Sequence, residues 1–190
     1  MRPRWVERLA RAAPRGYRPG ATLRRLRLEL RGVACEEVSG TRLDCRTDDG
    51  LAFTVCERTE AVFLAHTVCC EFRLPLPLAC AGEGRIVIRH RGMLRREGLI
   101  CQAQGADMGE LAALARRLQQ DHALQEALLP LDFRCCELRV EDGCWQLCIE
   151  HFAASEVVTS LPPMRRYLRL LDEQRLALLA AFRACGRLAA

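Results

Sequence analysis

The feature that most constrains how this chain can fold is an alternation of apolar and polar residues with a period of two, which begins at Thr41 and returns in several later segments. Such alternation is typical of strands that bury one face, and Gly, Pro and Asp between the segments are typical of turns. It predicts four hairpins: residues 41–46 with 51–57, 84–90 with 98–103, 132–140 with 144–152, and 156–161 with 165–170. Consecutive hairpins form a largely antiparallel sheet.

A longer strand is predicted over residues 60–73, between the first two hairpins. Its apolar face consists of Val62, Leu64, His66, Val68, Cys70 and Phe72. His66 lies in the middle of this face, so we expect a hydrogen-bonded core or edge histidine there rather than a ligand or a base. Residues 74–78 alternate Leu and Pro, and because Pro cannot donate to a strand ladder, we expect an edge or a loop.

Helical periodicity appears in three other regions. An amphipathic segment covers residues 21–32. Residues 107–129 have Asp107 as a candidate N-cap, and their apolar face slips in phase near Asp121, which predicts a kink or restart there. Asp172 begins a final helix through Arg183. Together with the hairpins, these helices predict an α+β fold with a largely antiparallel sheet and flanking helices.

The two halves of the chain are similar. Aligning Asp49-Gly50 with Asp142-Gly143 also matches charged residues around the two hairpins, and a helix precedes each hairpin. We therefore expect one α+β domain over residues 21–190, with two candidate pseudo-symmetric repeats, 21–106 and 107–190. A basic N-terminal arm or helix over residues 1–20 precedes this domain.

The composition excludes several enzyme classes. All 29 Lys and Arg residues are Arg, and Asn is absent. Without Lys there is no P-loop, no kinase phosphate-binding lysine and no Schiff base or pyridoxal phosphate anchor. Without Asn there is no papain-type triad. Residues 1–31 contain ten Arg and only two Glu, so the basic charge is concentrated where it could contact nucleic acid or anionic lipid.

Twelve cysteines occur, and none belongs to a C-x-x-C pair. No secretory signal is recognisable, so we expect a cytoplasmic protein whose reduced thiols pack as small apolar side chains. Cys144, Cys148 and His151 are metal-ligand types, but on a strand the two cysteines lie about 13 Å apart and His151 faces away from both. We predict no metal site and no cofactor.

Residues 150–156 contain the densest group of acid, base and nucleophile side chains, with Glu150 and His151 as the catalytic candidates. Neighbouring strand residues point to opposite faces, so these two could act together only across a bulge. The hydrolase motifs G-x-S-x-G and H-E-x-x-H are absent.

A second candidate site is a group of arginines around the tip of the second hairpin. Its members are Arg89, Arg91, Arg95 and Arg96. Guanidiniums presented together can bind phosphates or carboxylates, so these four are candidate ligand- or anion-binding residues. No aromatic residue is interleaved with them, which disfavours nucleic acid as the ligand.

Several stretches of the chain resemble a known family. They are Ala12-Ala-Pro-Arg-Gly-Tyr-Arg-Pro-Gly-Ala-Thr22, Leu129-Pro-Leu-Asp-Phe133, and Glu150-His-Phe-Ala-Ala-Ser-Glu-Val-Val158 with Arg165-Arg-Tyr167. The family is bacterial, has about this whole length, and is catalogued as domain of unknown function 3156. The resemblance implies an uncharacterised bacterial protein and transfers no catalytic or ligand residues.

These observations favour a non-enzymatic cytosolic module that binds a small ligand or a protein partner, because a curved sheet with leucine-rich helices can form a pocket. One alternative is an enzyme with a site near Glu150 and His151. Another is a protein that binds nucleic acid or anionic lipid through its basic N-terminal arm. No segment is long and apolar enough for a transmembrane span.

Overall fold

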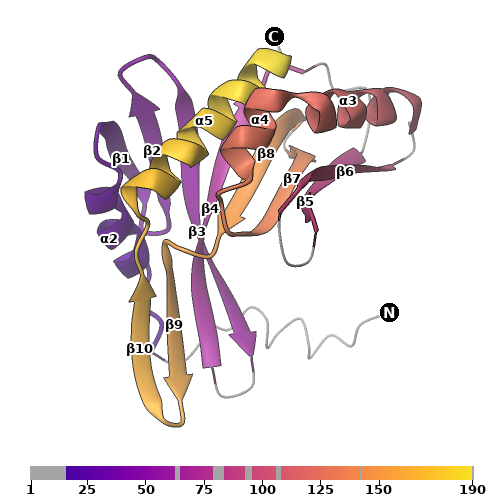
Figure 1. Ribbon diagram of the computed structural model, residues 1–190. Coiled ribbons are helices and arrows are strands. Elements are labelled where there is room, and N and C mark those ends of the chain that lie inside the picture. The colour runs from indigo at the N-terminus through magenta and orange to yellow at the C-terminus, as the bar shows by residue number, and fades with distance from the viewer. Residues whose placement is uncertain are drawn as a thin grey trace.

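A computed structural model describes residues 16–62, 65–78, 84–92, 96–105, 108–141 and 143–189. These residues form four helices and a ten-stranded sheet, which confirms the predicted α+β class (Figure 1). The helices are α2 (Ala21–Glu29), α3 (Met108–Gln120), α4 (His122–Leu128) and α5 (Asp172–Ala189). The strands are β1 (Val33–Ser39), β2 (Arg42–Thr47), β3 (Ala52–Val62), β4 (Ala65–Leu76), β5 (Gly84–Arg91), β6 (Gly98–Gly105), β7 (Phe133–Glu141), β8 (Cys144–His151), β9 (Ser155–Ser160) and β10 (Pro163–Leu168).

All strand pairs are antiparallel, and the main order across the sheet is β1-β2-β3-β4-β8-β7-β5-β6. β4 pairs on one side with two successive strands, because residues 71–76 pair with β8 and residues 65–68 pair with β9. β8 and β9 are therefore one strand interrupted by residues 152–154. β10 pairs with β9, and β3, β4, β9 and β10 project together away from α5 (Figure 1).

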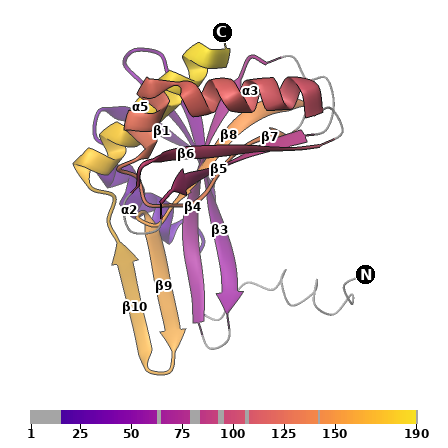
Figure 2. The same cartoon turned by 45° about the vertical axis from the view of Figure 1, so that its right-hand side comes forward.

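The helices pack on one face of the sheet (Figure 2). The alternate strand residues that face them form a single core with the apolar sides of the helices. α5 crosses this face, and the ring of Phe182 packs edge-on against Phe53 with centroids 5.4 Å apart. α3 and α4 are separate helices, as the phase slip predicts, because the Asp121 carboxylate accepts a hydrogen bond from the Leu124 N–H at 2.7 Å and caps α4.

The four predicted hairpins are confirmed as β2–β3, β5–β6, β7–β8 and β9–β10. The final helix extends past the predicted Arg183 to Ala189, because Ala184 and Cys185 continue its buried face. Residues 1–15 of the predicted N-terminal arm or helix, the Asp107 cap and the Asp142 turn position lie outside the described residues.

The single strand predicted over residues 60–73 is wrong. β3 ends at Val62, β4 begins at Ala65, and Ala61 pairs with His66 across the resulting hairpin. No Gly, Pro, Asn or Asp lies between the two strands, so the usual turn signal is missing. β4 then continues through Pro75 to Leu76, beyond its last pair with β3 at Arg73, so among the described residues this part of β4 has ladder pairs with β8 alone. Residues 74–76 therefore continue an interior strand where an edge or a loop was predicted, and Pro75 lies beyond the last β3 pair, where β3 needs no backbone N–H from it.

Candidate functional site

The face of the sheet opposite the helices carries a network of ion pairs. It joins side chains that alternate outward from β3, β4 and β7, and its central residue is Glu71. The Glu71 carboxylate lies 3.0 Å from the Arg58 guanidinium, 2.5 Å from that of Arg73 and 3.1 Å from that of Arg139. Glu141 lies 3.0 Å from Arg73 and 3.1 Å from Arg139. Glu71 is only 2% exposed, because the surrounding guanidiniums cover it.

The network shifts the pKa values of Arg139 and Glu141 toward their charged forms. Burial alone would lower the pKa of Arg139, but Glu137 and Glu71 raise it above the ordinary value. Burial would also raise the pKa of Glu141, yet hydrogen bonds from Arg139 and the charge of Arg73 lower it. Both pKa shifts favour the charged forms of Arg139 and Glu141, so these two residues are suited to holding neighbouring strands together rather than to acid–base chemistry near neutral pH.

Thiols next to the network are equally unreactive. Cys148 is 1% exposed, and burial raises its pKa to about 12. Burial likewise raises the pKa of Cys69 to about 12. A nucleophilic cysteine needs a thiolate, so neither residue is a candidate nucleophile.

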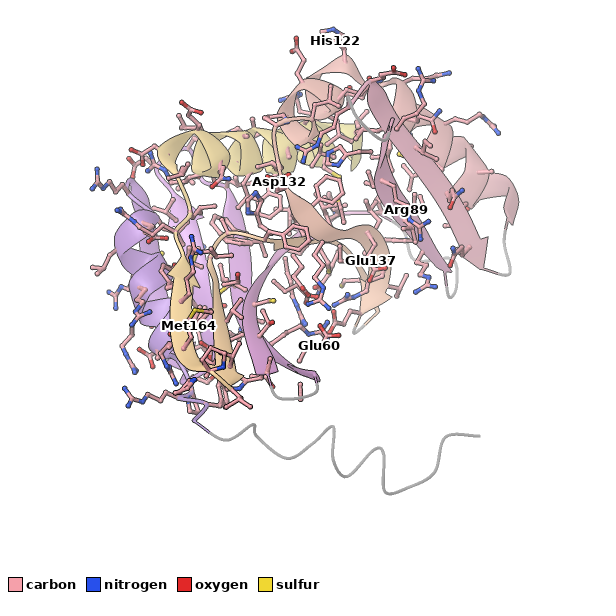
Figure 3. The ribbon with its side chains drawn as sticks, turned by 60° about the horizontal axis from the view of Figure 1, so that its bottom comes forward. Glu60, Arg89, His122, Asp132, Glu137 and Met164 are labelled. Carbon is pink, nitrogen blue, oxygen red and sulfur yellow. The ribbon has the colours of Figure 1, made fainter. Side chains whose placement is uncertain are left out.

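A groove of about 420 Å³ runs beside the network, between β5 and β7. The residues that line it include Arg85, Val87, Arg89, Gln104 and Glu137. Figure 3 shows Arg89 and Glu137 on the face turned away from the helices, with Glu60 farther along the same face. The Nε–H of Arg85 donates to the side-chain amide oxygen Oε1 of Gln104 at 2.8 Å, which occupies one guanidinium N–H and orders the groove wall.

The predicted arginine group is divided by the structure. Arg89 and Arg91 are exposed on the same outward face of β5, two residues apart. Arg96 instead donates to the carbonyl oxygens of Leu129 at 2.8 Å and Leu131 at 3.1 Å and pairs with Asp132. These carbonyls follow α4, so Arg96 satisfies acceptors at a helix C-terminus. Arg95 lies outside the described residues.

Glu150 and His151 are not brought together. Glu150 points to the uncovered face, where it lies 3.4 Å from Arg134, whereas His151 is 1% exposed on the helix-covered side. His151 Nδ1 accepts a hydrogen bond from the Ala153 N–H at 2.9 Å, and its Nε2 has no partner within the described residues. Burial lowers the pKa of His151 to about 4. The imidazole therefore stabilises the interruption between β8 and β9 in its neutral form.

Two further histidines lie on the helix side of the sheet, one buried and one exposed. His66 is buried on the α2 side of β4, and its Nε2 has no hydrogen-bond partner among the described residues. His122 and Glu126 form an exposed pair at 3.5 Å on α4, on the helix side of the molecule (Figure 3). Within the described residues, no three His, Cys, Asp or Glu side chains converge as metal ligands.

The half-buried carboxylate of Glu57, which contacts the start of α2, was not predicted. Glu57 accepts hydrogen bonds from the N–H of Gly20 at 2.8 Å, the N–H of Thr22 at 3.2 Å and the hydroxyl of Tyr17 at 2.7 Å. A β3 carboxylate therefore caps α2 across 37 residues of sequence. No local sequence pattern indicates this role, because the N-cap residue Gly20 has no side chain to cap α2 and Glu57 lies 37 residues away in sequence.

The basic N-terminal region is only partly described, since residues 1–15 lie outside the described part. Within α2, Arg25 pairs with Glu156 at 3.1 Å and lies over the Tyr167 ring at 5.4 Å. This arginine is held by the fold itself. No helix of the described residues combines the length and apolar character needed to cross a membrane.

These features define an α+β protein with a ten-stranded antiparallel sheet, helices on one face and an arginine-rich charged surface on the other. The family model described as "Protein of unknown function (DUF3156)" matches residues 28–189, and the chain belongs to this family. No curated protein and no solved structure matches the chain.

Proposed function

We propose that this protein is a non-enzymatic binding module of the bacterial cytoplasm whose small ligand presents a phosphate or carboxylate to Arg89 and Arg91. One observation carries the proposal. On β4 and β7, the arginines of the uncovered face are paired with carboxylates; they are Arg73, Arg134 and Arg139. On β5 of the same face, Arg89 and Arg91 have no ion-pair partner among the described residues.

The spacing of these two arginines suits a single anion. Residues two apart on a strand lie about 6.6 Å apart and point the same way, so two long side chains can reach one phosphate or carboxylate. The neighbouring groove offers Val87 to an apolar part of the ligand and Gln104 to a polar part. This combination of an apolar wall with few polar groups is typical of small-molecule sites.

The proposal is tested by calorimetric titration of the purified protein with inorganic phosphate and, separately, with malonate. The double variant Arg89→Met/Arg91→Met is expected to weaken binding of the preferred anion at least tenfold. The matched control Arg116→Met/Arg166→Met removes two exposed arginines that have no ion-pair partner among the described residues, and its affinity is expected to stay within twofold of wild type. The two anions distinguish phosphate from carboxylate recognition.

Saturable binding that is lost only in the Arg89/Arg91 variant supports the proposal. Absence of saturable binding to either anion, or equal weakening in both double variants, refutes it, because the second result indicates a general effect of net charge.

Two alternative functions stay predictions. The enzymatic alternative lacks an assembled acid–base pair, because Glu150 and His151 lie on opposite faces of the sheet. The alternative of nucleic-acid or lipid binding depends on the basic N-terminal arm, most of which lies outside the described residues.

A further inference from the structure

Two thiols meet at the edge of the sheet, far from the arginine groove. Cys35 on β1 and Cys45 on β2 are directly opposite each other in the strand register. Their sulfurs lie 3.3 Å apart, with the Cys45 S–H donating to Cys35 Sγ. A disulfide has an S–S distance of about 2.04 Å, so the two sulfurs need to approach by only about 1.3 Å to form a bond.

We propose that Cys35 and Cys45 form a thiol–disulfide exchange site at which glutathione disulfide joins β1 to β2. The proposal does not depend on ligand binding at Arg89 and Arg91. It assigns to Cys35 the first, attacking role and to Cys45 the resolving role.

The surroundings of the two thiols support these roles. Cys35 is half-buried on an edge strand and is therefore reachable, whereas Cys45 is 3% exposed. The hydrogen bond from Cys45 lowers the pKa of Cys35, although burial opposes this, and nearby Arg27 adds to the lowering. The same hydrogen bond and burial raise the pKa of Cys45. The accessible thiol is thus the one that more readily becomes a thiolate.

Other cysteines of the described chain lack this combination. Cys69 and Cys70 are neighbours in sequence on one strand, as are Cys135 and Cys136, so each pair points to opposite faces of the sheet. Among the thiol–thiol contacts of the described residues, the pair at Cys35 and Cys45 is the hydrogen-bonded one.

The exchange has two balanced steps. Cys35 loses its proton to solvent, and its thiolate attacks one sulfur of glutathione disulfide, which forms a mixed disulfide and releases one glutathione thiolate. Cys45 then loses its proton and attacks Cys35 Sγ, which forms the Cys35–Cys45 bond and releases the second glutathione thiolate. The two released thiolates take up the two protons, so two protein thiols are oxidised and one glutathione disulfide is reduced to two glutathione molecules.

The experiment exposes the full-length reduced protein to graded ratios of glutathione disulfide to glutathione, blocks remaining thiols with N-ethylmaleimide, and maps tryptic peptides by mass. Trypsin cleaves after Arg31, Arg42 and Arg46, so Cys35 and Cys45 fall on separate peptides, residues 32–42 and 43–46, each with one cysteine. The expected product is these two peptides joined, with a mass lower than their sum by two hydrogen atoms.

Three variants assign the roles. Cys45→Ser is expected to accumulate glutathione on Cys35, because the resolving thiol is missing. Cys35→Ser is expected to slow modification of Cys45 at least tenfold. The control Cys56→Ser changes a half-buried thiol on β3 and is expected to leave the joined peptide unchanged.

Two results would overturn the proposal. One is a chain in which other cysteines carry glutathione while peptides 32–42 and 43–46 stay separate. The other is glutathione labelling of Cys35 in the Cys45→Ser variant at the same rate as labelling of Cys45 in the Cys35→Ser variant. Circular dichroism of each Ser variant verifies that it is folded, and the wild-type peptide map tests the proposal without any substitution.

Discussion

Replacing Glu71 by Gln tests whether the charged network stabilises the protein as a buried cluster. The Glu71 side chain is 3% exposed and accepts hydrogen bonds from Arg58, Arg73 and Arg139. Gln keeps the volume but removes the charge, which leaves Arg73 and Arg139, each about one-fifth exposed, with one carboxylate fewer.

The expected loss follows from the burial of the partners. Removing one member of a buried ion pair costs about 3–5 kcal/mol of unfolding free energy. The Arg58 contact adds little, because Arg58 is half-exposed and surface pairs contribute about 0–1 kcal/mol. Arg73 and Arg139 keep Glu141 as a partner, so we expect a loss near the lower bound, about 3 kcal/mol.

Urea unfolding followed by circular dichroism measures this loss, and the thermal midpoint is expected to fall by about 6–12 °C. The matched control is Glu60→Gln on β3, whose half-exposed carboxylate pairs with Arg134, and it is expected to cost less than about 1 kcal/mol. The reasoning is refuted if Glu71→Gln is within about 1 kcal/mol of wild type, or if the two variants are equally destabilised.

Three further predictions concern the fold. Gly20 has φ 74°, and a Cβ there would collide with the Gly40 carbonyl oxygen, so Gly20→Ala is expected to lower the free energy of unfolding in urea by at least about 2 kcal/mol. Gly50 has φ 86° but open space around it, so the control Gly50→Ala is expected to cost about 1 kcal/mol. Equal costs for the two variants would contradict this reasoning. Burial lowers the pKa of His151 to about 4, so the unfolded chain binds a proton first as pH falls, and stability is expected to decrease between about pH 6.5 and 4 by up to roughly 3 kcal/mol. His151→Gln should flatten the pH dependence of the urea midpoint in that window, and an unchanged slope would show that His151 is not its source. Arg96→Met removes donors to the Leu129 and Leu131 carbonyls and is expected to cost about 1–2 kcal/mol in the same assay without changing anion affinity; a binding defect at unchanged stability would place Arg96 in the ligand site.

The candidate site was only partly predictable. Arg89 and Arg91 follow from the alternation of β5, because odd positions share one face of that strand. Their separation from Arg96 does not, since Arg96 is directed by carbonyl acceptors after α4, more than 30 residues away in sequence. Likewise, Glu150 and His151 were expected on opposite faces of a strand, but the hydrogen bond from Ala153 to His151 required the structure.

Local patterns determined the elements themselves. Alternation with turn residues located all four predicted hairpins, and Asp121 marked the break between α3 and α4, because strand faces, tight turns and helix caps depend on residues close together in sequence. The two candidate repeats stay a prediction. Where the local turn signal was missing, between Val62 and Ala65, the predicted strand was wrong.

Only the tertiary structure decided how these elements combine. The pairing of β4 with both β8 and β9, the burial of Glu71 beneath three guanidiniums and the cap that Glu57 provides for α2 all join residues distant in sequence. On β4, Glu71 alternates with apolar residues, and an exposed Glu on the polar face of a strand has the same pattern. The sequence around Glu71 therefore cannot show whether its side chain is buried or exposed. That distinction arises when neighbouring strands place arginines around it, because desolvation and charge pairing depend on spatial neighbours rather than on position along the chain.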